Sequence, residues 1–217
     1  MLLRSSIYCV VWLAASLLAH AGESCPGAAE WTSRHPAMPT ESSPAPSNPE
    51  LLSALEARVE RDQAARKKWL ANQNDEALAS AVDAIDVDNV AWLRAEVADR
   101  GFPTVAAAGR RGVHLAWVLL QHADRDPQLQ SDLLPVIERR FADGELDAND
   151  LARLTDRLLQ REDKPQRFGT QFDWFAGDFK LPEKAELAKI DAERKSLGLM
   201  PLADYVCTLR QAREKNR

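Results

Sequence analysis

Apolar residues recur at intervals of three and four along most of the chain after residue 48, as Leu51, Leu55 and Val59 illustrate. This spacing places apolar side chains on one face of a helix, and Gly and Pro divide the pattern into segments. We therefore expect one mostly α-helical domain over residues 50–217, with about six to eight helices. The expected helices cover about 49–69, 76–85, 86–100, 113–123, 127–142, 148–162, 182–197 and 202–213, and a loop covers 106–112.

Capping residues define several of the expected boundaries. Asp126 followed by proline is a strong helix start, and Gly101 is a C-terminal stop. Asp86 or Asp88 can cap the third helix, which would separate it from the second. Pro135 falls inside the fifth helix, and we expect it to kink or split that helix.

Residues 166–181 differ in character from the helical segments. Aromatic and polar residues alternate loosely there around Ala176-Gly177. The pattern is typical of a small β-hairpin or of an ordered aromatic loop, and the sequence does not choose between them.

The first 21 residues have the features of a secretory signal peptide. Arg4 precedes an apolar run, and Ala19-His20-Ala21 supplies the small residues read by signal peptidase. The run is too short for a comfortable membrane span. We expect cleavage after Ala21, a periplasmic or secreted location, and no integral membrane segment in the mature chain.

A Pro-rich leader follows over residues 22–49. Its prolines lie among Ser, Ala, Thr and Glu, with little apolar surface to offset the entropy of ordering. We expect an extended or disordered spacer, in which Trp31 is the exception because it can dock on the folded domain.

Two cysteines remain after signal cleavage, Cys25 and Cys207, one near each end of the chain. An even pair in an exported protein favours an intramolecular disulfide. Two free thiols, or a bridge to another chain, are the alternatives.

The overall charge bears on the choice of partner. The chain has 28 Lys+Arg against 33 Asp+Glu and a sequence pI near 5.5. Nucleic acid is not expected as a partner, because phosphate binding needs a basic face.

The most apolar expected helix carries a polar stripe. His114, Trp117, Gln121 and Asp124 are spaced three, four and three residues apart and so share a face. Such a stripe is costly to bury unless every group finds a partner. It therefore indicates either a recessed site, with His122 as an acid–base group, or a structural polar network. The candidate catalytic residues are His122, Asp124 and Asp156.

Motifs for other chemistries are missing. The sequence has no His-Glu-x-x-His pair, serine-nucleophile motif, Walker-type loop or dinucleotide fingerprint. Asp124 and Asp126 have a plainer role as helix caps, so we assign no metal ligand and no cofactor.

Several short motifs occur in a recognisable order. They are Gln121-His122-Ala123-Asp124, Leu154-Thr155-Asp156-Arg157, Gly169-Thr170-Gln171, and Leu197-Gly198-Leu199 followed by Pro201-Leu202. In this order the chain resembles a widespread bacterial family of unknown function, over about residues 50–206. Phe168 stands where that family usually has tyrosine. The resemblance implies a helical domain in which the candidate residues converge. The ligand-binding candidates are Gln63, His114, Gln121, Arg157, Gln166, Thr170 and Gln171.

Three functions remain open on the sequence. The first is a periplasmic or secreted binding protein for a small ligand, a peptide or a partner protein. The second is a hydrolase of envelope material that uses His122 with an aspartate, and the third is an inhibitor or immunity-type protein. An enzyme requires a water-accessible His122, whereas an interaction protein requires an exposed apolar patch, with Trp174, Phe175 and Phe179 as candidates.

Overall fold

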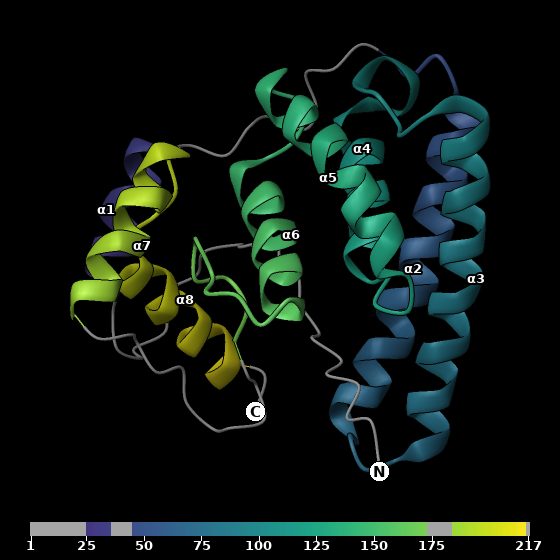
Figure 1. Cartoon of the computed structure of the whole chain (residues 1–217). Coiled ribbons are helices and arrows are strands. Elements are labelled where there is room, and N and C mark those ends of the chain that lie inside the picture. Colours follow the sequence, from purple (N-terminus) through teal and green to yellow (C-terminus); the bar gives the residue numbers. More distant parts are fainter. Residues whose placement is uncertain (1–24, 36–44, 173–183, 216–217) are drawn as a thin grey trace. The chain divides into compact units, whose positions relative to one another are not determined.

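The structure is a computed structural model that describes residues 25–35, 45–172 and 184–215 (Figure 1). The expected signal peptide lies outside these residues. The described ranges contain helices and no strand, which confirms the predicted helical fold class. The helices are α1 (Pro26–Arg34), α2 (Pro49–Ala71), α3 (Glu76–Arg100), α4 (Val105–Gln121), α5 (Pro127–Ala142), α6 (Ala148–Arg161), α7 (Lys184–Ser196) and α8 (Leu202–Lys215).

The helical fold divides into two compact units. The central unit is Pro39–Leu154, and the terminal unit combines Met1–Met38 with Thr155–Arg217. The boundary between them falls inside α6. Each unit is described by itself below.

Three helices build the core of the central unit. The long helices α2 and α3 pack side by side, and α4 packs against both (Figure 1). The buried stripe of α2 includes Leu55 and Trp69, and that of α3 includes Val82 and Leu93. Both stripes also contain charged residues, which form the site described in the next subsection.

Helix α3 is one uninterrupted helix, so the expected break at residues 85–88 is wrong. Its N-cap is Asp75, whose carboxylate accepts hydrogen bonds from the next helical N–H groups. Asp86 and Asp88 cap nothing, because their carboxylates accept hydrogen bonds from arginines of α2 instead. No glycine or proline lies between residues 76 and 100 to end the helix earlier.

Helix α4 includes the segment that was expected to be a loop, and it is interrupted at one residue of that segment. The loop expected over residues 106–112 is wrong, because these residues belong to α4 and only Gly109 interrupts the helix, with φ 71°. This left-handed conformation is readily available to glycine. The far end of α4 is closed by the buried Gln130, whose Nε2 donates to the carbonyl of Leu120 at 2.9 Å. His122 follows as the C-cap residue.

Helix α5 begins as predicted. Asp126 accepts a hydrogen bond from the Leu129 N–H at 3.1 Å, and proline follows it in the first turn. The helix then runs without division past Pro135. The predicted alternative of two separate helices is therefore wrong.

The terminal unit joins the two ends of the chain. Cys25 and Cys207 form a disulfide, as predicted, and α1 packs against α8. Ile190, Leu202 and Val206 form a buried cluster between α7 and α8. The expectation of extended chain throughout the leader is wrong for residues 26–34, because they form α1.

The segment expected to be a hairpin or an aromatic loop lies partly outside the described residues. Residues 166–172 form an irregular loop with no strand. Gly169 adopts φ 62°, and a Cβ there would lie 2.9 Å from a methyl group of Leu202. Glycine thus allows this loop to lie directly on α8.

Candidate functional site

Two carboxylates in the core of the central unit share one arginine. On α2, Arg66 Nε donates to Asp62 Oδ1 at 3.0 Å. Its Nη2 donates to Asp86 Oδ1, on α3, at 2.5 Å. Asp62 is 1% exposed, Arg66 3% and Asp86 9%. The guanidinium is therefore a buried bridge between the two helices, and it uses one oxygen of each carboxylate.

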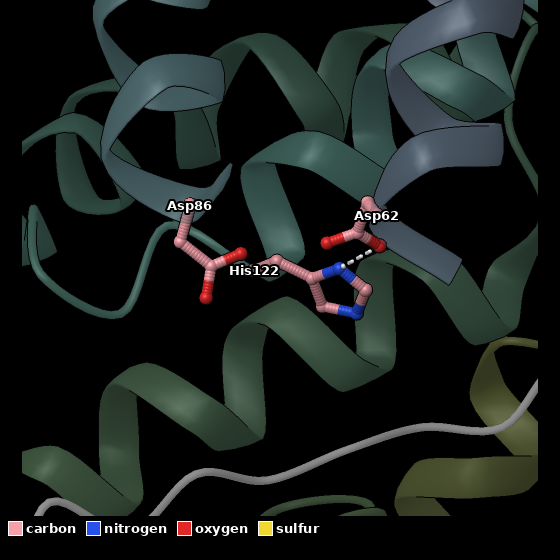
Figure 2. A group of neighbouring side chains, drawn as sticks. All are labelled: Asp62, Asp86 and His122. Atoms are coloured by element: carbon pink, nitrogen blue, oxygen red, sulfur yellow. Dashed lines mark hydrogen bonds and ion pairs between the residues drawn. The ribbon is translucent and has the colours of Figure 1, made fainter. Parts of the chain in front are cut away.

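The third member of the group is His122, at the end of α4. Its Nδ1 lies 2.9 Å from Asp62 Oδ2, the oxygen that Arg66 does not contact. Gln63 Nε2 donates to the same oxygen at 2.8 Å. The side chain of His122 is only 5% exposed. In Figure 2 its imidazole lies between the side chains of Asp62 and Asp86.

The two carboxylates have opposite pKa shifts. Burial raises the pKa of Asp62, but the charge of His122 and its hydrogen bond, together with the charge of Arg66, bring that pKa down to about 2. Burial raises the pKa of Asp86 to about 7, because Arg66 offsets it only in part and Asp62 and Asp124 add repulsion. Asp62 is therefore ionised at neutral pH, and His122 Nδ1 carries the proton that it donates to Asp62.

The arrangement is suited to holding a positive charge. One ligand atom each from Asp62, Asp86 and His122 lie within 4.8 Å of one another. Arg66 is the only hydrogen-bond partner of Asp86 in the described part of the chain, and it occupies Oδ1. Asp86 Oδ2 is thus open to a ligand. We name Asp62, Arg66, Asp86 and His122 the buried charge cluster.

A second histidine–aspartate pair lies elsewhere in the central unit. His114 Nδ1 is 3.0 Å from Asp150 Oδ2, and Trp117 Nε1 donates to the Asp150 carbonyl at 3.0 Å. The His114 ring also stacks on Trp117. Burial raises the pKa of Asp150, which is 1% exposed. These contacts tie the start of α6 to α4, and the side chain of His114 remains 27% exposed.

Asp156 is the centre of a separate group in the terminal unit. Its Oδ1 accepts from the N–H groups of Arg167 at 2.8 Å and Phe168 at 3.0 Å. Its Oδ2 accepts from the N–H of Thr170 at 2.9 Å and from the Thr170 hydroxyl at 2.8 Å. Burial raises the pKa of Asp156, and the hydrogen bonds from these donors offset that rise only in part. All of these donors belong to one loop, so the carboxylate holds that loop on α6.

The same loop is held at two further points. The side-chain amide of Gln166 makes two hydrogen bonds with the backbone of Gln171, at 2.8 and 2.9 Å. The buried Arg194 of α7 donates to the carbonyls of Phe168 and Met200. These contacts run from side chain to backbone, which is how a loop is fixed in place.

The structure distributes the predicted site residues over both units. His114, Gln121, His122 and Asp124 lie in the central unit with Gln63. Gln63 contacts Asp62, the partner of His122, while Asp124 lies near enough to raise the pKa of Asp86. The terminal unit contains Asp156, Arg157, Gln166, Thr170 and Gln171, of which Asp156 bonds Thr170 and Gln166 bonds Gln171.

Three members of the buried charge cluster were not among the predicted site residues: Asp62, Arg66 and Asp86. A signal for them exists in the sequence. Asp62 and Arg66 are four residues apart on the otherwise apolar face of α2, and Asp86 lies four residues after Val82 on the buried face of α3. A charged pair inside an apolar stripe indicates a buried polar site.

Fold and site together define a helical protein with a histidine–carboxylate cluster in its core. The chain belongs to a family of unknown function, DUF6624, whose model matches residues 49–215. Neither the curated proteins nor the solved structures include a match to the chain. No described helix combines the length and the apolar character needed to span a membrane.

The Asp156 contacts predict a structural loss on mutation. Asp156→Asn replaces an acceptor oxygen by a donor and leaves backbone N–H groups of the loop unsatisfied. We expect the free energy of unfolding to fall by roughly 2–5 kcal/mol in urea titrations, because each stranded buried donor costs about 1–3 kcal/mol. Thr170→Val removes one donor only and is expected to cost about 1 kcal/mol. Equal stability of Asp156→Asn and wild type would contradict this role.

The opposite shifts of Asp62 and Asp86 predict a pH dependence of stability. The pKa of Asp86 is about 7 in the folded state, against an ordinary value of 3.8 for an aspartate, so the free energy of unfolding declines as pH rises from about 4 to 7. The pKa of Asp62 is lowered, so its contribution is lost as pH falls from about 4 towards 2. The midpoint of thermal unfolding should therefore be highest near pH 4, where the two ranges meet.

Asp86→Asn removes the group that ionises in this range. The variant should therefore lose less stability than wild type above pH 4, and its midpoint of thermal unfolding at pH 8 should be higher. A gain of about 1 kcal/mol corresponds to about 2–4 °C in a protein of this size. Asp88→Asn is the matched control, because Asp88 lies two residues further on α3 and its pKa is lowered by Arg61 and Arg58. A decline in Asp86→Asn as steep as in wild type would refute the assignment.

Proposed function

We propose that the protein is an exported binding protein that holds a positively charged ligand at the buried charge cluster. The observation that carries the binding role is the open Oδ2 of Asp86, beside a second carboxylate and a histidine. Because Asp86 Oδ2 accepts no hydrogen bond from the described residues, it can accept one from a ligand. Residues kept for function often reduce stability, and the burial that raises the pKa of Asp86 is such a cost.

Charge supports a cationic ligand. Asp62 and Asp86 share the guanidinium of Arg66, the charge of His122 acts on Asp62, and Asp124 adds repulsion at Asp86. An anionic ligand would add to this negative charge, and an apolar one would leave it uncompensated. A cation at Asp86 Oδ2 compensates it directly.

The hydrolase alternative is not favoured by the burial of its key residue. A general base must reach the proton that it abstracts, and His122 is only 5% exposed. Asp156, the other catalytic candidate, uses both oxygens to hold a loop.

No observation favours docking of a partner protein or an inhibitor role. Val87, 55% exposed, is the only exposed large hydrophobic side chain in the described part of the chain. Binding surfaces for proteins usually present a larger apolar patch. Trp174, Phe175 and Phe179, proposed for such a patch, lie outside the described residues.

Export is supported by the disulfide between Cys25 and Cys207, since disulfides persist in oxidising compartments. We expect the full-length chain, expressed in a bacterium, to be recovered outside the cytoplasm with Gly22 as its first residue. Mass spectrometry should find that residue, and thiol titration of the denatured protein should find no free cysteine. An intact Met1 terminus in the cytoplasmic fraction, with free thiols, would contradict export.

The binding role is tested by thermal unfolding of the oxidised mature chain with three ligand classes: divalent cations, small primary amines and cationic peptides. We expect one class to raise the midpoint, because a ligand at 100 times its Kd adds about 2.7 kcal/mol to stability. The shift should be lost in Asp86→Asn and retained in Asp88→Asn. The proposal fails if no class raises the midpoint or if Asp86→Asn responds as wild type does.

A further inference from the structure

We infer that the ligand of the buried charge cluster is a single divalent transition-metal ion, bound by Asp62, Asp86 and His122. This inference rests on the proposed binding function and specifies its ligand. It is carried by the convergence within 4.8 Å of three ligand atoms, from α2, from α3 and from the C-cap of α4. Asp62 and His122 are buried, and the side chain of Asp86 is 11% exposed.

The distances approach those of a metal site and must shorten when an ion binds. Zinc–ligand bonds to nitrogen and oxygen are about 2.0–2.2 Å, so two ligand atoms of a tetrahedral ion lie about 3.4 Å apart. Asp62 Oδ2 and His122 Nδ1 are already 2.9 Å apart. All three ligand atoms lie within 4.8 Å of one another, so the widest pair must close by up to about 1.4 Å on metal binding.

Arg66 does not occupy the position of the ion. Its guanidinium takes Asp62 Oδ1 and Asp86 Oδ1, which leaves Oδ2 of both carboxylates for the ion. Gln63 also donates to Asp62 Oδ2. Groups that hydrogen-bond the ligating carboxylates orient them and are a regular feature of metal sites. Arg66 and Gln63 are thus positioning residues in this assignment.

The proton balance is simple. The ion replaces the proton that His122 Nδ1 donates to Asp62, and that proton is released to solvent. The ion then bridges the same two atoms and adds the open oxygen of Asp86 as its third protein ligand. A fourth position remains for water or another small ligand.

The ligand set selects the class of metal. One imidazole with two carboxylates suits first-row ions such as Zn²⁺, Mn²⁺ and Fe²⁺, whereas Mg²⁺ and Ca²⁺ favour oxygen ligands alone. Cys25 and Cys207 form a disulfide and offer no thiolate. Zn²⁺ and Co²⁺ are therefore suitable probes, because Co²⁺ reports its coordination by visible absorption.

The test is calorimetric titration of the EDTA-treated, oxidised mature chain with ZnCl₂, CoCl₂ and MgCl₂. We expect one Zn²⁺ per chain, a Co²⁺ absorption band that Zn²⁺ abolishes, and at least 100-fold weaker binding of Mg²⁺. Asp86→Asn and His122→Gln should each weaken Zn²⁺ binding at least 10-fold. Asp88→Asn and His35→Ala remove an exposed acid and an exposed histidine and should bind as wild type does.

The outcomes separate this inference from the proposed function. Far-UV circular dichroism checks that each variant is folded. If His122→Gln does not fold, the Zn²⁺ affinity of Asp86→Asn decides the test. Absence of Zn²⁺ and Co²⁺ binding, or unchanged affinity in Asp86→Asn, overturns the metal assignment. If an amine or a cationic peptide then still stabilises the chain through Asp86, the binding function stands without the metal. If nothing binds through Asp86, both fail.

Discussion

The central unit depends on a guanidinium placed between two buried carboxylates. Arg66 joins α2 to α3 through Asp62 and Asp86, and Asp62 extends the connection to His122 at the end of α4. Two like charges this close repel strongly in a poorly solvated core, and the arginine makes their proximity tolerable. Its compensation is incomplete, because the pKa of Asp86 remains raised to about 7.

The buried charge cluster and the Asp156 group use buried charge in different ways. Asp156 directs both of its oxygens at a single loop and leaves no acceptor for anything else. Asp86 has one engaged oxygen and one open oxygen. Both aspartates are buried, and they differ in how many of their oxygens accept hydrogen bonds from the described residues.

Local sequence signals were sufficient for the helical class and for boundaries such as Asp126 with its proline. They were insufficient wherever a distant partner decides the role of a residue. Asp86 was expected to be a cap because an aspartate before an apolar segment commonly is one. Its actual role depends on Arg66, twenty residues away. Likewise, His122 was predicted as a site residue, but its partner Asp62 is sixty residues distant and no local pattern joins them.

The disulfide also sets the order in which the protein can be completed. The central unit is continuous in sequence, whereas the terminal unit takes α1 from one end of the chain and α7 and α8 from the other. A chain that emerges from its N-terminus first can therefore fold the central unit while Cys25 still waits for Cys207, some 182 residues later. The first segment to emerge is among the last to be fixed in place, and its cysteine must escape other oxidation partners until synthesis is almost finished.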